Sequence, residues 1–131
     1  MSEHPNAAIV RAGFERFARG DVSGLVGLFA EDGVWHVPGA NAMAGEYRGR
    51  EEILAFLRRT AELTAGTYRA DLLWVVADEA HTVAVYRARG EREGRASLDI
   101  EQALLVELRD GFWVDVHAQP LEQPAFDAFW A

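Results

Sequence analysis

Four histidines are the side chains of this sequence best suited to proton transfer or metal binding, because imidazole titrates near neutral pH and ligates divalent metals. His36 and His117 fall in segments of strand-like composition, and Asp115 precedes His117 by two residues. The histidines lack the i, i+4 spacing of a helical zinc motif and have no cysteine partner. We therefore expect no metal site and no cofactor. His36 or His117 is a candidate general base only if its strand turns it into the interior.

Two polar side chains interrupt strand faces that are otherwise apolar. Gln102 stands among leucine, isoleucine and valine at two-residue spacing, and Tyr86 shares a face with Ala84 and Ala88. A buried amide is stable only when it is hydrogen-bonded, and a phenol can donate to a carbonyl or an oxyanion. Gln102 and Tyr86 are therefore the candidate catalytic residues. The alternative is that Gln102 pairs with a protein neighbour and Tyr86 is an ordinary strand residue whose hydroxyl reaches the rim.

These side chains must be positioned by a single domain spanning residues 1–131, because a chain of this length forms one core. Half of the residues are apolar or aromatic and 26% are charged, which excludes a largely disordered chain. The net charge is −8, and every basic residue is arginine. An acidic surface repels phosphate backbones and anionic lipids, so we expect neither a nucleic-acid nor a membrane partner.

The cellular compartment follows from what the sequence lacks. There is no cysteine, which excludes disulfides, thiolate nucleophiles and zinc–thiolate sites. The N-terminal residues have neither the basic nor the apolar region of a secretion signal, and the longest apolar run, residues 72–77, is too short to cross a membrane. These features predict a cytoplasmic protein.

The N-terminal half of the chain is predicted to be mostly helical. Apolar residues at helical spacing predict a helix over residues 6–19 and another over residues 50–64. Between them we expect a short second helix, which Asp21 caps and whose apolar stripe ends with Phe29. A short strand, Val34–Val37, lies between the second and third helices and stops at a Pro-Gly pair. The glycine-rich segment 38–49 is expected to be a loop.

The C-terminal half is predicted to be sheet. Four β-rich runs cover residues 68–77, 81–89, 96–108 and 112–119, and the turns between them are short enough to force antiparallel pairing. Residues 121–130 are expected to form a tail with one helical turn, anchored by Phe126, Phe129 and Trp130. Helices followed by a strand meander predict an α+β fold, a cone-shaped curved antiparallel sheet wrapped around three N-terminal helices, with a pocket at its open end.

Several segments of the sequence resemble a known family. These are Gly20–Asp32, Val34–Gly39, Ala44–Ile53 and Arg109–Gly111, which are similar to the motifs of the SnoaL-like branch of the nuclear transport factor 2-like superfamily. The branch holds ketosteroid isomerases and polyketide cyclases, and the resemblance covers nearly the whole chain. It implies the same cystatin-like α+β fold, but it is weak evidence for activity because this fold hosts many functions.

The resemblance also implies where the superfamily's known chemistry would lie. In ketosteroid isomerases, which are relatives and not this protein, an aspartate base works with an oxyanion hole of tyrosine and a protonated aspartate. The base position matches Val37, the tyrosine falls near Gly13 and the protonated aspartate near Leu104. The acidic residue of related polyketide cyclases matches Ala118. None of these side chains can transfer a proton, so enolisation by those groups is improbable.

The expected pocket is therefore almost entirely apolar. Besides Gln102 and Tyr86, the residues predicted to line it are Trp35, Val37, Phe56, Leu104, Val116 and Ala118. Met43 and Tyr47 are expected beside the pocket mouth, where they either form a lid or serve only to pack the loop. Such a pocket would hold a small apolar molecule mainly by burial of apolar surface.

The outer face of the predicted sheet is a candidate interface. Strict two-residue alternation along 112–119 places Trp113, Asp115 and His117 on the face opposite the core, together with His36. Tryptophan and histidine are more typical of interfaces than of bare surface, so these four residues predict a homodimer through the convex face.

The sequence and the resemblance leave two functions open. The first is a mostly apolar pocket for a small cyclic or polyketide-like molecule, with cofactor-independent isomerase, cyclase or hydratase activity that does not use the isomerase acid–base residues. The alternative is a non-catalytic dimeric binding or interaction module of the same fold. The sequence does not name a substrate.

Overall fold

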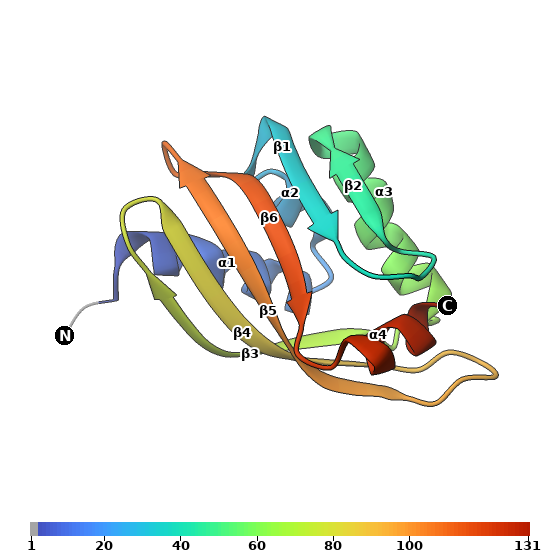
Figure 1. Cartoon of the computed structure of the whole chain (residues 1–131). Helices are drawn as coiled ribbons and strands as arrows, with labels where there is room; N and C mark the ends of the chain where they lie inside the picture. The colour runs from blue at the N-terminus through green and yellow to red at the C-terminus, as the bar shows by residue number, and fades with distance from the viewer. Residues whose placement is uncertain (1–2) are drawn as a thin grey trace.

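The computed structural model describes residues 3–131 (Figure 1). Its helices are α1 (Pro5–Ala18), α2 (Val22–Val26), α3 (Gly49–Leu63) and α4 (Gln123–Trp130). Its strands are β1 (Phe29–Val37), β2 (Gly45–Arg48), β3 (Arg69–Ala77), β4 (His81–Gly90), β5 (Leu98–Arg109) and β6 (Phe112–Pro120). They form one curved mixed sheet in the order β2-β1-β6-β5-β4-β3. The predicted α+β fold with a curved sheet is confirmed.

The first helices begin and end at residues that satisfy their free backbone groups. Pro5 stands in the first turn of α1, where a missing N–H costs nothing. Gly20 takes a positive φ of 75° after α1, which lets the Asp21 N–H reach back to the Arg16 carbonyl. The Asp21 carboxylate then accepts from the Gly24 N–H at 2.9 Å and so caps α2. These residues are why α1 stops and α2 starts within three residues.

The N-terminal part of the sheet differs from the sequence-based expectation. The second helix ends at Val26, and Phe29 begins β1, where it lies opposite Trp113 of β6. β1 and β6 are parallel, whereas the sequence predicted an entirely antiparallel sheet. The expected loop 38–49 contains β2, which pairs with β1 through Trp35 and Tyr47. Partners from distant parts of the chain supply these hydrogen bonds, so local composition did not reveal them.

A bulge in β6 corrects the predicted outer face. Glu107 lies opposite Asp115 but Leu108 lies opposite Trp113, so Val114 is an extra residue in β6. The extra residue reverses the alternation, and Trp113 turns into the core with 1% of its surface exposed. The predicted placement of Trp113 on the convex face is therefore wrong, while Asp115 and His117 keep their outward orientation.

The helices cover the concave side of the sheet, and α4 lies near its open end (Figure 1). α1 packs on β3 and β4, and α3 packs on β1. α4 is a helix of eight residues where the sequence predicted one turn, and the three expected anchors, Phe126, Phe129 and Trp130, are all buried. Among the described helices, none is long and apolar enough to span a membrane.

Candidate functional site

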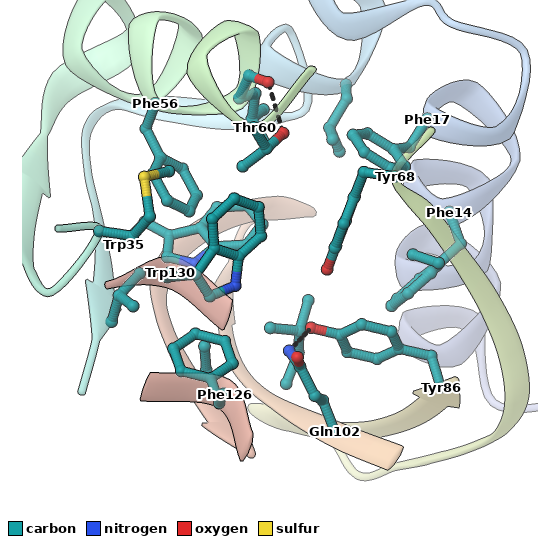
Figure 2. A pocket seen from close by; sticks show the side chains of 18 of the residues that line it. Phe14, Phe17, Trp35, Phe56, Thr60, Tyr68, Tyr86, Gln102, Phe126 and Trp130 are labelled. Atoms are coloured by element: carbon teal, nitrogen blue, oxygen red, sulfur yellow. Dashed lines mark hydrogen bonds between the residues drawn. The ribbon is translucent and has the colours of Figure 1, made fainter. Parts of the chain in front are cut away.

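A cavity of about 70 Å³ lies between the concave face of the sheet and helices α1, α3 and α4 (Figure 2). The sheet side contributes Trp35, Val37, Ala70, Tyr86, Gln102, Leu104, Trp113 and Ala118, with Tyr68 just before β3. The helical side is mostly aromatic and includes Phe14, Phe17, Phe56, Phe126 and Trp130. The cavity is smaller than the 300–1,000 Å³ or so of pockets that hold drug-sized ligands, so a molecule of that size would have to displace side chains on entry.

The polar centre of the cavity is the pair Gln102 and Tyr86. The two residues lie opposite one another on β5 and β4, and the Gln102 amide donates to the Tyr86 hydroxyl at 2.7 Å. Gln102 Oε1 has no hydrogen-bond partner although the residue is buried. The indole nitrogens of Trp35 and Trp113, whose side chains also line the cavity, are unpartnered as well. Buried polar atoms are normally paired, so these three atoms are exceptions among the residues that line the cavity.

Two phenols supply the titratable groups of the lining. Burial raises the pKa of Tyr68 well above its ordinary value, and burial together with the neighbouring Tyr68 raises the pKa of Tyr86. Both hydroxyls point into the cavity (Figure 2). They are consequently neutral at physiological pH and act as hydrogen-bond donors or acceptors, not as bases.

The cavity lining carries no charge in the described residues. No carboxylate, imidazole or guanidinium group lines it. Gly13, Val37 and Leu104, the three positions that match the isomerase acid–base residues, all lie on the cavity wall. At Gly13 a Cβ atom would come within 2.6 Å of the Trp113 ring, so this wall has no room for a larger side chain. The positions that the resemblance relates to those acid–base residues therefore lie on the cavity wall, and none of the three residues can transfer a proton.

Helix α4 covers the cavity with two aromatic side chains. Phe126 and Trp130 are buried and line it. The Arg92 guanidinium donates to the Phe129 carbonyl at 2.8 Å and lies 6.0 Å from the centre of the Trp130 ring. The Ala42 N–H donates to the Trp130 carbonyl at 3.0 Å, which ties α4 to the loop after β1.

Eight of the predicted site residues line the cavity: Gln102, Tyr86, Trp35, Val37, Met43, Phe56, Leu104 and Ala118. Two others do not. Tyr47 stacks on Phe56 with ring centres 4.4 Å apart and donates its hydroxyl to the Met43 carbonyl at 2.6 Å, so it braces the loop. Val116 is fully buried in the core opposite Trp35. The long indole side chain of Trp35 reaches the cavity, whereas the shorter valine side chain does not.

Several cavity residues were missed by the sequence-based prediction. Tyr68, Phe14 and Phe17 were treated as parts of a strand or helix core, and Phe126 and Trp130 only as anchors of a tail. Helical spacing shows that Phe14 and Phe17 share a face but not what that face meets. The aromatic residues after residue 121 were the one available signal, because a polar surface tail rarely carries three of them.

The histidines lie outside the cavity. His36 and His117 are on the outer face of the sheet with Asp115, which rules out either imidazole as a base inside the cavity. Their rings stack with centres 4.0 Å apart and planes 1° from parallel. The expected outward orientation of His36, Asp115 and His117 is thus confirmed, whereas nothing tests their place in a dimer interface.

Comparison with known proteins identifies the domain type. Residues 10–116 match the family model of the SnoaL-like domain. The uncharacterized protein Rv0034 of Mycobacterium tuberculosis is 35% identical over 132 residues, covering 100% of both chains. The structure of Bal32a, from a soil-derived mobile gene cassette, is similar with 35% identity, a TM-score of 0.91 and 96% of each chain covered. An NTF2-like protein of Burkholderia pseudomallei shares the fold at 20% identity and a TM-score of 0.85, covering 100% of this chain and 99% of that one.

Proposed function

The chain belongs to the SnoaL-like domain family, and from this premise we propose that it binds a neutral, mainly apolar cyclic or polyketide-like molecule that carries a carbonyl or hydroxyl group. The observation that carries the proposal is the unpartnered Oε1 of Gln102 beside the Tyr86 hydroxyl, at the polar centre of an otherwise apolar cavity. An amide oxygen without a partner costs free energy in the empty cavity, and a hydroxyl or amide proton of a ligand would recover it.

The chemistry of the lining defines the ligand class. Aromatic and aliphatic walls bind a ligand by removing its apolar surface from water, at about 25 cal/mol per Å². The two protonated phenols and the indole N–H groups can each donate a hydrogen bond to a carbonyl oxygen. A charged ligand would lose its hydration without gaining an opposite charge in this lining. Neutral ligands are therefore selected over anions and cations.

Any catalysis in this cavity relies on orientation and on polarisation of the carbonyl. Tyr86 accepts the Gln102 N–H and keeps its own proton available for a substrate oxygen. With no base among the lining residues, the reactions that fit are isomerisations or cyclisations of substrates already reactive enough to need only a fixed conformation. This activity needs no cofactor.

The test is a thermal-shift screen of the purified protein with neutral cyclic ketones, steroids and polyketides, followed by titration of the hits. A ligand that binds only the native state raises the melting temperature. Replacing Gln102 by Leu should weaken a ligand whose hydroxyl or amide proton donates to Oε1 by roughly 1–2 kcal/mol, about five- to thirtyfold in Kd. Thr82→Val is the matched control, because Thr82 is buried with an unpartnered hydroxyl but lies outside the cavity.

The proposal fails if Gln102→Leu and Thr82→Val bind the hits equally well, since the amide would then have no part in recognition. It also fails if charged compounds bind more tightly than neutral compounds of the same size.

A second candidate function is a non-catalytic dimeric module, and the outer face of the sheet favours it. Trp74 and Val76 on β3 and Leu105 on β5 are each about half exposed, more than a strand buried on both faces would allow. A second copy of this chain is the partner we propose for that surface. Ligand titration and the oligomeric state separate the two functions, because the non-catalytic module requires a dimer but no ligand in the cavity.

A further inference from the structure

Three side chains of metal-ligating types converge on the outer face of the sheet, the face opposite the cavity. Asp115 Oδ1 lies 2.7 Å from His36 Nε2, and Asp115 Oδ2 lies 3.1 Å from His117 Nε2. The side chains are 24%, 34% and 54% exposed for His36, Asp115 and His117 respectively. Among residues 3–131, these three form the one group of at least three such side chains close enough to share an ion.

The sheet itself sets this geometry. β1 and β6 run parallel with His36 directly opposite His117, and Asp115 lies two residues earlier on the same face of β6. Figure 1 shows these strands side by side at the centre of the sheet. β2 adds Glu46 directly opposite His36. Strands position side chains more precisely than loops do, so His36, Asp115 and His117 share a rigid support, with Glu46 beside them on the edge strand β2.

His36 lies between two carboxylates, and a neutral ring cannot satisfy both. Its Nδ1 is 3.3 Å from Glu46 Oε1, and its Nε2 is 2.7 Å from Asp115 Oδ1. A neutral imidazole carries one proton, so it can donate to one carboxylate while its other nitrogen presents a lone pair to the second. A lone pair facing a carboxylate oxygen is repulsive, so this arrangement needs either a second proton on the ring or a cation between the two atoms.

The geometry points to a divalent transition-metal site formed by His36 Nε2, His117 Nε2 and one oxygen of Asp115. Two imidazoles and one carboxylate suit zinc, nickel or copper, and three protein ligands leave a fourth position open to water. Ligand bonds of about 2.0–2.2 Å in a tetrahedron separate ligand atoms by about 3.3 Å. The two contacts to Asp115 therefore need to lengthen by a few tenths of an ångström and the imidazole planes need to tilt, which partly exposed side chains permit.

Glu46 completes the arrangement as a positioning residue. Its Oε1 lies 3.3 Å from His36 Nδ1, where it could accept the ring proton when Nε2 binds the metal, in the usual carboxylate–histidine–metal order. Its other oxygen is 2.7 Å from Arg48, so the carboxylate is itself oriented. The site does not depend on the cavity or on any ligand bound there.

The experiment is calorimetric titration of untagged, chelator-treated protein with ZnCl₂, and absorption spectroscopy of the Co²⁺-loaded protein. We expect one ion per chain and the strong visible bands of four-coordinate Co²⁺. His117→Ala and Asp115→Asn should each weaken Zn²⁺ binding at least tenfold. Glu46→Gln should keep the stoichiometry and lower the affinity about tenfold or more, as loss of an outer carboxylate does.

His81→Ala is the matched control, because His81 is also a histidine beside an aspartate, 3.4 Å from Asp78, on an exposed turn. This variant should bind Zn²⁺ as the unmodified chain does. Binding that His117→Ala leaves unchanged, or that His81→Ala abolishes, overturns the site. The site is also overturned if the unmodified chain binds Zn²⁺ no more tightly than a His36→Ala/His117→Ala double variant with the same melting temperature.

Discussion

The Gln102 amide and the Tyr86 hydroxyl are joined at 2.7 Å across directly opposed positions of β5 and β4. The phenol oxygen is the acceptor, so Tyr86 keeps its own proton, and Gln102 keeps its carbonyl oxygen and its second amide proton. Both residues are nearly inaccessible to solvent. A change at either residue therefore alters both the stability of the fold and the polar centre of the cavity lining.

Replacing the two members of this pair should have unequal effects on stability. Tyr86→Phe leaves a buried amide without partners and should lower the free energy of unfolding by about 1–3 kcal/mol. Gln102→Leu removes the unsatisfied amide together with the hydrogen bond and should change it by less than about 1 kcal/mol. In urea denaturation, the double variant should be more stable than Tyr86→Phe alone. Simple additivity of the two single changes would show that the pair is not coupled.

Gly13 lies in α1, where Ala normally stabilises a helix by up to about 1 kcal/mol. Here the added Cβ would lie 2.6 Å from the rigid, buried ring of Trp113. Gly13→Ala should therefore destabilise the protein by about 1–3 kcal/mol and alter the near-ultraviolet circular dichroism of the indole. Gly27→Ala is the control, because its nearest contact is a backbone oxygen at 3.4 Å. Equal stability of the two variants would contradict the close approach.

Stability should decline in alkali. The raised folded-state pKa values of Tyr68 and Tyr86 mean that the unfolded chain releases these protons first, near the ordinary phenol pKa of about 10. Their contribution to stability is complete below that pH and decreases above it, by up to about 1.4 kcal/mol per pH unit for each phenol. Urea denaturation across this range should show the decrease, and Tyr68→Phe should reduce its slope. Ionisation of Tyr68 in the native state near pH 10, followed by near-ultraviolet absorbance, would be inconsistent with its burial.

The proposed dimer should be visible in sedimentation at micromolar concentration. Val76, Val83, Leu105 and His117 lie opposite one another on successive strands, so the apolar surface runs into the histidine cluster. Leu105→Glu should shift the protein to monomer, because a charge at a dimer contact loses its hydration. Leu121→Glu, at a more exposed leucine outside this row, should leave the dimer intact. A monomeric unmodified chain would refute the interface.

Local patterns predicted most of the architecture and most of the cavity. The apolar spacing of residues 50–64 and the short turns after residue 77 are local signals, and the corresponding α3 and the antiparallel strands β3 to β6 are present. The two-residue alternation along β5 correctly predicted that Gln102 and Leu104 face inward. Where two-residue periodicity is unbroken, sequence alone assigns the face of a strand.

The errors come from features that sequence periodicity does not encode. A bulge at Val114 reversed the orientation of Trp113, and nothing in the surrounding composition marks it. The metal-ligating cluster was missed because helical spacing was the pattern sought, whereas its members meet through a parallel pairing of strands some eighty residues apart. The covering role of α4 depends on its contacts with Arg92 and Ala42, which are also distant from α4 in sequence.

The position of β6 between β1 and β5 has a consequence for synthesis on the ribosome. β1 emerges early but lacks its neighbour β6 until residues 112–120 have been translated. Its apolar face, including Trp35 and Val37, therefore cannot be fully buried before then. Until then both β1 and β5 present open edges, which favours pairing with other chains. Pairings this distant also make folding slow compared with helical proteins. Chaperone demand should therefore be greatest just before β6 leaves the exit tunnel.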